Sequence, residues 1–117
     1  MGPTTHEVVL SDLAGADEVR VSDNLDITYA RVSDPATIAR LAAWLGERES
    51  GWYVPSTGVP VASLRLNFSR AGASMGSVAL DQDYLVAQRR GEFALRDAAP
   101  GDRAEALAIL GVDDPEG

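Results

Sequence analysis

Residue types that usually carry catalysis are scarce in this sequence. It has one histidine, His6, and no cysteine. A Ser–His triad needs a histidine beside its serine, and both thiol catalysis and thiolate metal sites need cysteine. All 10 basic residues are arginines, which excludes Schiff-base lysines and the lysine of a P-loop. We therefore expect a protein that is not an enzyme and that uses no cofactor.

Carboxylate chemistry is the remaining catalytic alternative. The chain has 18 acidic residues, so close pairs such as Asp23/Asp26 and Glu47/Glu49 arise from number alone. Such a pair can serve general acid–base catalysis only within a complete site. An enzyme that relies on carboxylates alone is kept as a remote alternative.

One acidic cluster partly matches a calcium-binding loop. Asp81, Asp83 and Glu92 stand at positions 1, 3 and 12 of an EF-hand count. Leu85 and Val86 occupy the positions that need an oxygen ligand and a glycine. The pattern favours a solvated turn, and we expect no metal site.

Arginines and aromatics offer two candidate binding features. Arg65 and Arg96 with Arg89 and Arg90 could bind an anion, although ordinary pairing with neighbouring carboxylates is favoured. The irregular stretch 49–60 contains the four candidate binding residues Trp52, Tyr53, Val54 and Pro55. Aromatic residues are enriched in binding hot spots, so this loop could be an exposed recognition surface. In the alternative interpretation, Trp52 folds back and caps the core between helix and sheet.

Residues 33–48 give the strongest helix signal. Asp34 suits the N-cap and Pro35 the first helical position. Ile38, Leu41 and Leu45 share one face at helical spacing, so the helix must cover a sheet.

Alternating apolar residues predict strands on both sides of this helix. The predicted strands are Val8–Leu10, Glu18–Ser22, Leu25–Val32, Val61–Phe68, Ser74–Leu80, Tyr84–Gln88 and Glu92–Arg96. In Leu25–Val32 we expect Leu25, Ile27 and Tyr29 on one face. A second helix should follow Pro100-Gly101-Asp102, with Asp102 and Glu105 as a capping box and Gly111 as its end.

This order of elements predicts an α+β fold: a single domain with a mostly antiparallel sheet meander, and one central and one C-terminal helix on one face. Residues 1–6 are expected to be disordered or derived from an expression vector. Residues 7–111 form the domain, and 112–117 form an acidic mobile tail.

Charge restricts the partners. The net charge is −8, and residues 1–34 carry seven acids and two arginines, hence −5. Acidic ends disfavour nucleic acid and anionic membranes but suit a basic protein partner. No apolar run is long enough for membrane insertion, and no signal peptide is recognised in MGPTTHEVVL. A chain without cysteine fits a cytoplasmic location, with export as the alternative if a signal segment has been removed.

The chain loosely resembles a diffuse group of small bacterial α+β domains described as hypothetical or lipoprotein-type proteins of unknown function. The residues that carry the resemblance, within 18–111, are Asp34-Pro35, Ile38, Leu41, Leu45, Trp52, Leu64, Leu66, Phe68, Gly91 and Leu107. The group implies no catalytic residues, and this chain lacks the cysteine that carries a lipid.

These features together predict a non-catalytic, acidic protein-binding module of inhibitor or immunity type. The alternative is an envelope-associated or small-ligand-binding domain. The sequence does not predict the oligomeric state.

Overall fold

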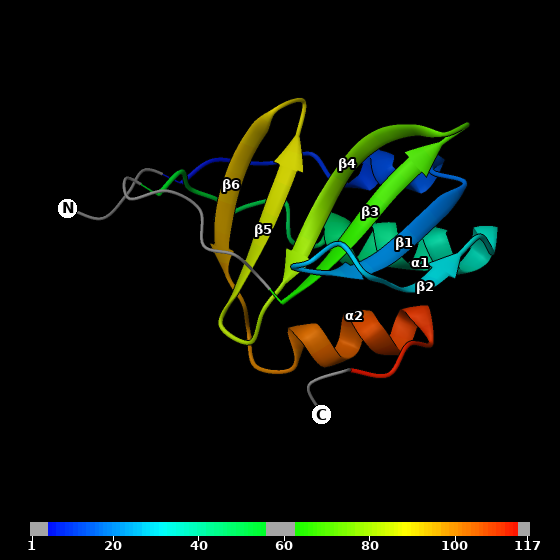
Figure 1. The fold of residues 1–117 in the computed structure, drawn as a ribbon. Coiled ribbons are helices and arrows are strands. Elements are labelled where there is room, and N and C mark those ends of the chain that lie inside the picture. The colour runs from blue at the N-terminus through cyan, green and yellow to red at the C-terminus, as the bar shows by residue number, and fades with distance from the viewer. Residues whose placement is uncertain (1–4, 56–62, 115–117) are drawn as a thin grey trace.

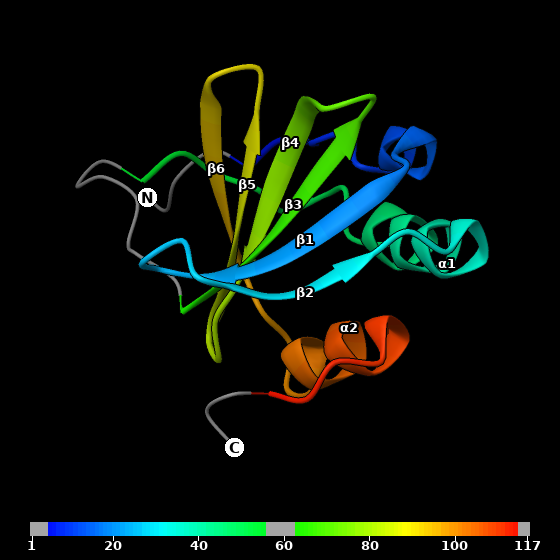
Figure 2. The ribbon, with the colours of Figure 1, turned by 45° about the vertical axis from the view of Figure 1, so that its right-hand side comes forward.

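A computed structural model describes residues 5–55 and 63–114 of the chain. Six antiparallel strands form one sheet in the order β2-β1-β3-β4-β5-β6, and both α-helices lie on the same side of it (Figures 1 and 2). The predicted α+β fold is confirmed. The elements are η1 (a 3-10 helix, Ser11–Gly15), β1 (Glu18–Asp23), β2 (Thr28–Val32), α1 (Pro35–Gly46), β3 (Leu64–Arg70), β4 (Ala73–Leu80), β5 (Tyr84–Arg89), β6 (Glu92–Asp97) and α2 (Asp102–Leu110).

The core lies between the helices and the inner face of the sheet. Val19 and Val21 of β1 stand beside Phe68 and Leu66 of β3, and all four are buried. Their neighbours on each strand point to the opposite, open face, as the period-2 alternation requires. The alternation predicted for these strands is therefore confirmed.

α1 begins and packs as the sequence predicts. The Asp34 carboxylate accepts a hydrogen bond from the backbone N–H of Thr37 at 3.1 Å, which satisfies an otherwise unpaired donor of the first turn. Ile38, Leu41 and Leu45 are completely buried. This apolar face ties α1 to the sheet.

Arg48 joins the two α-helices. Its guanidinium stacks on the Trp44 ring at 3.8 Å from the ring centre, and it donates to Asp102 of α2 at 3.1 Å. The Trp44 indole N–H donates to Glu105 of α2 at 3.0 Å. Asp102 and Glu105 thus bind α1, and the predicted capping box is wrong. The N-cap of α2 is Gly101, which has no side chain to accept a hydrogen bond.

Two tight hairpin turns lie in the gaps between predicted strands. Ala71-Gly72 joins β3 to β4, and Arg90-Gly91 joins β5 to β6, with positive φ at all four residues. This backbone twist matches that of the flanking strands and favours glycine at the second turn position. The predicted strand Val61–Phe68 is observed as β3, and positions 61 and 62 lie outside the described residues.

The predicted strand Val8–Leu10 is wrong. Leu10 is buried and precedes η1, where a turn was expected. The Glu49 side chain accepts from the backbone N–H groups of Leu10 and Ser11 at 2.7 and 2.9 Å. A carboxylate therefore supplies the acceptor that a neighbouring strand would have supplied.

Both ends of the predicted domain extend further than expected. His6 pairs with Trp52 through two backbone hydrogen bonds, at 2.7 and 3.1 Å. At the other end, Arg103 of α2 is buried and forms an ion pair with Asp114 at 2.7 Å. Its guanidinium also donates to Ser63 and to the carbonyl of Leu80. The acidic tail is thus bound to the domain as far as Asp114.

Candidate functional site

The four residues predicted to bind a partner do not form one exposed patch. The Trp52 side chain is fully buried, and its indole N–H donates to the carbonyl of Arg48 at 2.6 Å. Tyr53 is half-buried and pairs with Leu95 of β6 through two backbone hydrogen bonds of 2.8 Å. Val54 remains 65% exposed. Trp52 therefore caps the core, and its indole is not available to a partner.

The same segment covers one edge of the sheet. Tyr53 occupies the outer edge of β6, so this edge is partly paired within the chain. β2 lies at the opposite edge, where no other described strand pairs with its outer side. Unpaired edges are the part of a sheet to which another chain can add a strand.

Three large apolar side chains are exposed where β1 leads into β2. Leu25 is 74% exposed, Ile27 56% and Tyr29 48%. The prediction of a strand that begins at Leu25 is wrong. β2 begins only at Thr28, and its inward residues are Ala30 and Val32. We name residues 23–29, which run from the last residue of β1 to the second residue of β2, the β1–β2 loop.

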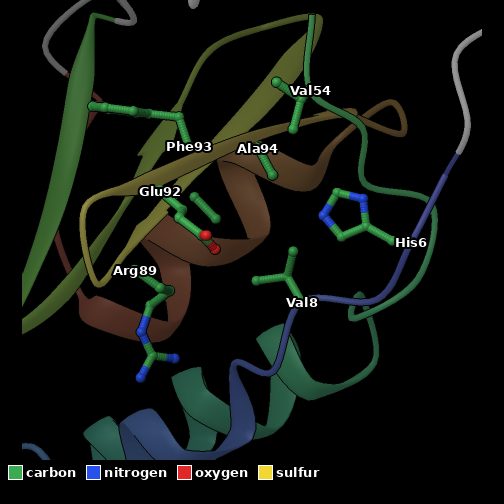
Figure 3. Close-up of a pocket in the computed structure, with 8 residues that line it drawn as sticks. His6, Val8, Val54, Arg89, Glu92, Phe93 and Ala94 are labelled. Carbon is green, nitrogen blue, oxygen red and sulfur yellow. The ribbon is translucent and has the colours of Figure 1, made fainter.

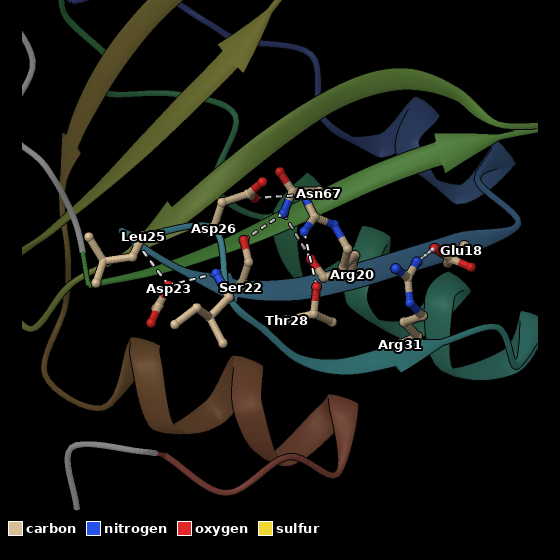
Figure 4. A network of polar contacts seen from close by, with 10 residues as sticks. Glu18, Arg20, Ser22, Asp23, Leu25, Asp26, Thr28, Arg31 and Asn67 are labelled. Atoms are coloured by element: carbon tan, nitrogen blue, oxygen red, sulfur yellow. Dashed lines mark hydrogen bonds and ion pairs between the residues drawn. The ribbon is translucent and has the colours of Figure 1, made fainter.

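Hydrogen bonds fix the shape of the β1–β2 loop (Figure 4). The Asp23 carboxylate accepts from the backbone N–H groups of Leu25 and Ile27, at 2.9 and 2.8 Å. Arg20 forms an ion pair with Asp26 at 2.9 Å and donates to the Thr28 hydroxyl. These bonds brace the loop backbone while its apolar side chains face water.

This bracing explains why the strand prediction failed. Alternation in sequence is the same whether Leu25 and Ile27 stand in a strand or in a turn. Asp23 is the available signal, because an Asp side chain commonly binds backbone N–H groups two to four residues further on. These bonds close a turn before the strand begins.

The four arginines of the predicted anion patch are divided by the structure. Arg89 donates to both Asp12 oxygens at 2.8 and 3.1 Å, and also to the carbonyls of Val9 and Met75. Arg96 donates to the carbonyl of Ser50 at 2.9 Å. Arg65 and Arg90 lie apart from these bonds and line a depression on the open face.

A separate cavity of about 330 Å³ lies beside the N-terminal segment (Figure 3). Val8, Val54 and Ala94 give it apolar walls, and His6 and Glu92 face it from opposite sides. The Phe93 ring points away from it. His6, expected to lie in a disordered end, is brought to this cavity by its pairing with Trp52. The cavity is large enough for a small molecule with a polar group at either end.

Two carboxylates near this cavity are held in the charged form. The hydrogen bonds from Arg89 lower the pKa of Asp12 below its ordinary value. The backbone N–H groups of Leu10 and Ser11 lower the pKa of Glu49 in the same way. Both carboxylates fix the N-terminal segment, so their role here is structural.

The structure gives no support to a metal site in the part of the chain that it describes. Within residues 5–55 and 63–114, no three histidine or acidic side chains gather as metal ligands would. Asp81 accepts from the backbone N–H of Gln82 at 2.6 Å, as in a simple turn. In these same ranges neither α-helix has the length and hydrophobicity that crossing a membrane requires.

No protein-family model, curated protein or solved structure matches this chain.

Proposed function

We propose that the protein is a non-catalytic, acidic protein-binding module of inhibitor or immunity type. It contacts its partner through the β1–β2 loop. The observation that carries the proposal is the exposure of Leu25, Ile27 and Tyr29 on a loop that Asp23 and Arg20 hold rigid.

Rigid apolar loops are favourable for binding. Large side chains at the centre of an interface supply most of its free energy when a partner removes them from water. A loop that is already ordered loses less conformational entropy on association. The open edge of β2 next to the loop adds backbone groups that a partner strand could pair with.

The charge favours a basic partner. Residues 1–34, which contain the loop, carry seven acids and two arginines. Long-range attraction between this acidic segment and a basic protein would speed association and weaken as salt increases. The same negative charge disfavours binding to nucleic acid. We further propose a cytoplasmic location, because the chain has no cysteine.

A comparison of two double variants tests the proposal by the proteins that each captures from an extract of the native host. Immobilised protein is exposed to an extract of that host, and bound proteins are compared for the wild type and two double variants. Leu25→Ala with Ile27→Ala removes the loop side chains. Val9→Ala with Val54→Ala is the matched control, because these valines are 61% and 65% exposed elsewhere.

We expect one basic protein to bind the wild type and the control at low salt, and to be lost from the loop variant. Binding should weaken as ionic strength rises. Retention of the same protein by the loop variant would contradict the proposal. Its loss from the control alone would move the interface to the Val9 and Val54 surface.

The cavity beside His6 favours small-ligand binding as a second candidate function. Its apolar walls and two facing polar groups suit a small amphipathic molecule. A screen of small molecules by NMR should then shift the signals of His6, Val8 and Ala94 together. An envelope-associated role, implied by the loose resemblance, would further require a signal segment in the gene.

A further inference from the structure

A shallow depression of about 320 Å³ lies on the open face of the sheet, away from the helices. Asn67 of β3, Ser77 of β4 and Gln88 of β5 are neighbours across three strands and form one polar row. All three side chains line the depression. The Asn67 amide nitrogen already donates to the Arg20 carbonyl and the Ser22 hydroxyl, both at 3.0 Å. The Ser77 hydroxyl and the Gln88 amide are the groups of this row that can donate hydrogen bonds to a bound molecule.

Two arginines flank this row. Arg65 precedes Asn67 by two residues on β3, and Arg90 follows Gln88 by two residues in the β5–β6 turn. β3 and β5 run in the same direction, because each is antiparallel to β4. The arginines therefore approach the row from opposite sides. Their backbones are about two strand spacings, or roughly 10 Å, apart across the sheet and about four residues, or roughly 13 Å, apart along the strands, so their long side chains must reach toward each other over the row.

Neither guanidinium is neutralised by a direct bond to a described residue. Among the described residues, no hydrogen bond or ion pair involves the Arg65 or Arg90 side chain, and none of those lining the depression is acidic. Arg90 also lies near enough to Asp12 to contribute to its lowered pKa, but Asp12 is already bound by Arg89. Arg90 also borders an adjoining depression that Glu7, Asp12 and Glu92 line, but Arg65 and Arg90 are the charged residues among those lining this one.

We propose that this depression binds small phosphate-bearing molecules. Guanidinium groups match the geometry and charge of phosphate oxygens, and the Ser77 hydroxyl and the Gln88 amide supply further donors. The volume falls in the range of small-molecule sites. The two arginines at opposite ends favour a ligand with two linked phosphates over a single phosphate.

NMR titration tests this site directly. Inorganic phosphate and pyrophosphate are added to ¹⁵N-labelled protein at constant ionic strength, which is maintained with chloride. The wild type is compared with Arg65→Gln and Arg90→Gln. Arg70→Gln is the control, since Arg70 lies on the same strand as Arg65 and does not line the depression.

We expect saturable shifts centred on Ser77 and Gln88, with pyrophosphate binding more tightly than phosphate. Each test variant should raise the Kd for pyrophosphate about tenfold or more, because hydrogen bonds to charged groups are among the strongest. Arg70→Gln should leave the Kd unchanged. Equal binding by all four proteins, or shifts spread over every arginine, would overturn the assignment.

The phosphate site is independent of the protein-binding proposal. The β1–β2 loop and the depression share no residue, so loss of anion binding leaves partner capture as a separate question.

Discussion

Trp52 allows a sharp energetic prediction at the scale of single residues. It is fully buried, so Trp52→Ala should lower the free energy of unfolding by about 3–5 kcal/mol through the cavity it leaves. Val54→Ala, at the exposed neighbour, should change it by less than about 0.5 kcal/mol. Urea denaturation measures both. If both substitutions changed the free energy of unfolding by the same small amount, Trp52 would be exposed, and residues 52–55 would again be candidates for a recognition site.

Asp114 carries the second residue-scale prediction. The Arg103 guanidinium is buried, and Asp114 binds it through two oxygens at 2.7 and 2.8 Å. Asp114→Ala should lower the free energy of unfolding by about 3–5 kcal/mol, because it breaks a buried ion pair. Asp113→Ala, at an exposed neighbour, is the control and should be nearly neutral. A thermal or urea melt that treats the two variants alike would exclude this anchoring role.

Sequence reasoning at this scale identified residues that act through local spacing. Asp34 as N-cap depends only on residues within one helical turn. The partners of Glu49, Arg89 and Arg103 lie far along the chain, so no local spacing predicts them. Trp52 could be assigned either to core or to surface, and only the complete fold decides.

The β1–β2 loop carries the prediction at the scale of elements. Asp23→Ala removes the acceptor for two backbone N–H groups, so the amides of Leu25 and Ile27 should exchange with deuterium faster. Asp23→Asn keeps an acceptor oxygen and should preserve most of the protection. Hydrogen exchange followed by NMR distinguishes the variants. Unchanged exchange in Asp23→Ala would mean that the loop is held by other contacts.

Elements with strong local signals were predicted well. α1 and the two glycine-containing hairpins were close to their observed bounds, because capping and turn chemistry act within a few residues. β2 was predicted too long, since the turn built by Asp23 interrupts an alternating run. The prediction of a strand at Val8–Leu10 was wrong, because the side chain of Glu49, which is distant in sequence, accepts the hydrogen bonds of the backbone N–H groups of Leu10 and Ser11.

Stability against pH tests the charge network of the whole molecule. Backbone hydrogen bonds lower the folded-state pKa of Glu49 below its ordinary 4.5. Its contribution is therefore present above that pH and is lost as pH falls through the lowered value. Urea midpoints measured between pH 7 and pH 3 should fall less steeply for Glu49→Gln than for the wild type. The exposed Glu47→Gln control should follow the wild type, and a parallel slope for both variants would contradict this role.

The α+β architecture was predictable because each amphipathic element needs the others to bury its apolar side. The exposed surface was less predictable than the architecture, since the exposure of an apolar side chain depends on the whole fold. The sequence offered Trp52 as a candidate binding residue, with a position in the core as the alternative, and predicted Leu25 and Ile27 within a strand. The structure buries Trp52 and exposes Leu25 and Ile27. This reversal of the candidate surface, from Trp52 to Leu25 and Ile27, is the basis of the proposed interface.

A soluble paramagnetic agent tests this reversal in one NMR experiment. The agent enhances relaxation of nuclei that face water. We predict strong enhancement at the methyl groups of Leu25 and Ile27 and little at the Trp52 indole N–H. Strong enhancement at Trp52 with protected Leu25 and Ile27 methyl groups would refute the reversal and remove the β1–β2 loop as the binding surface.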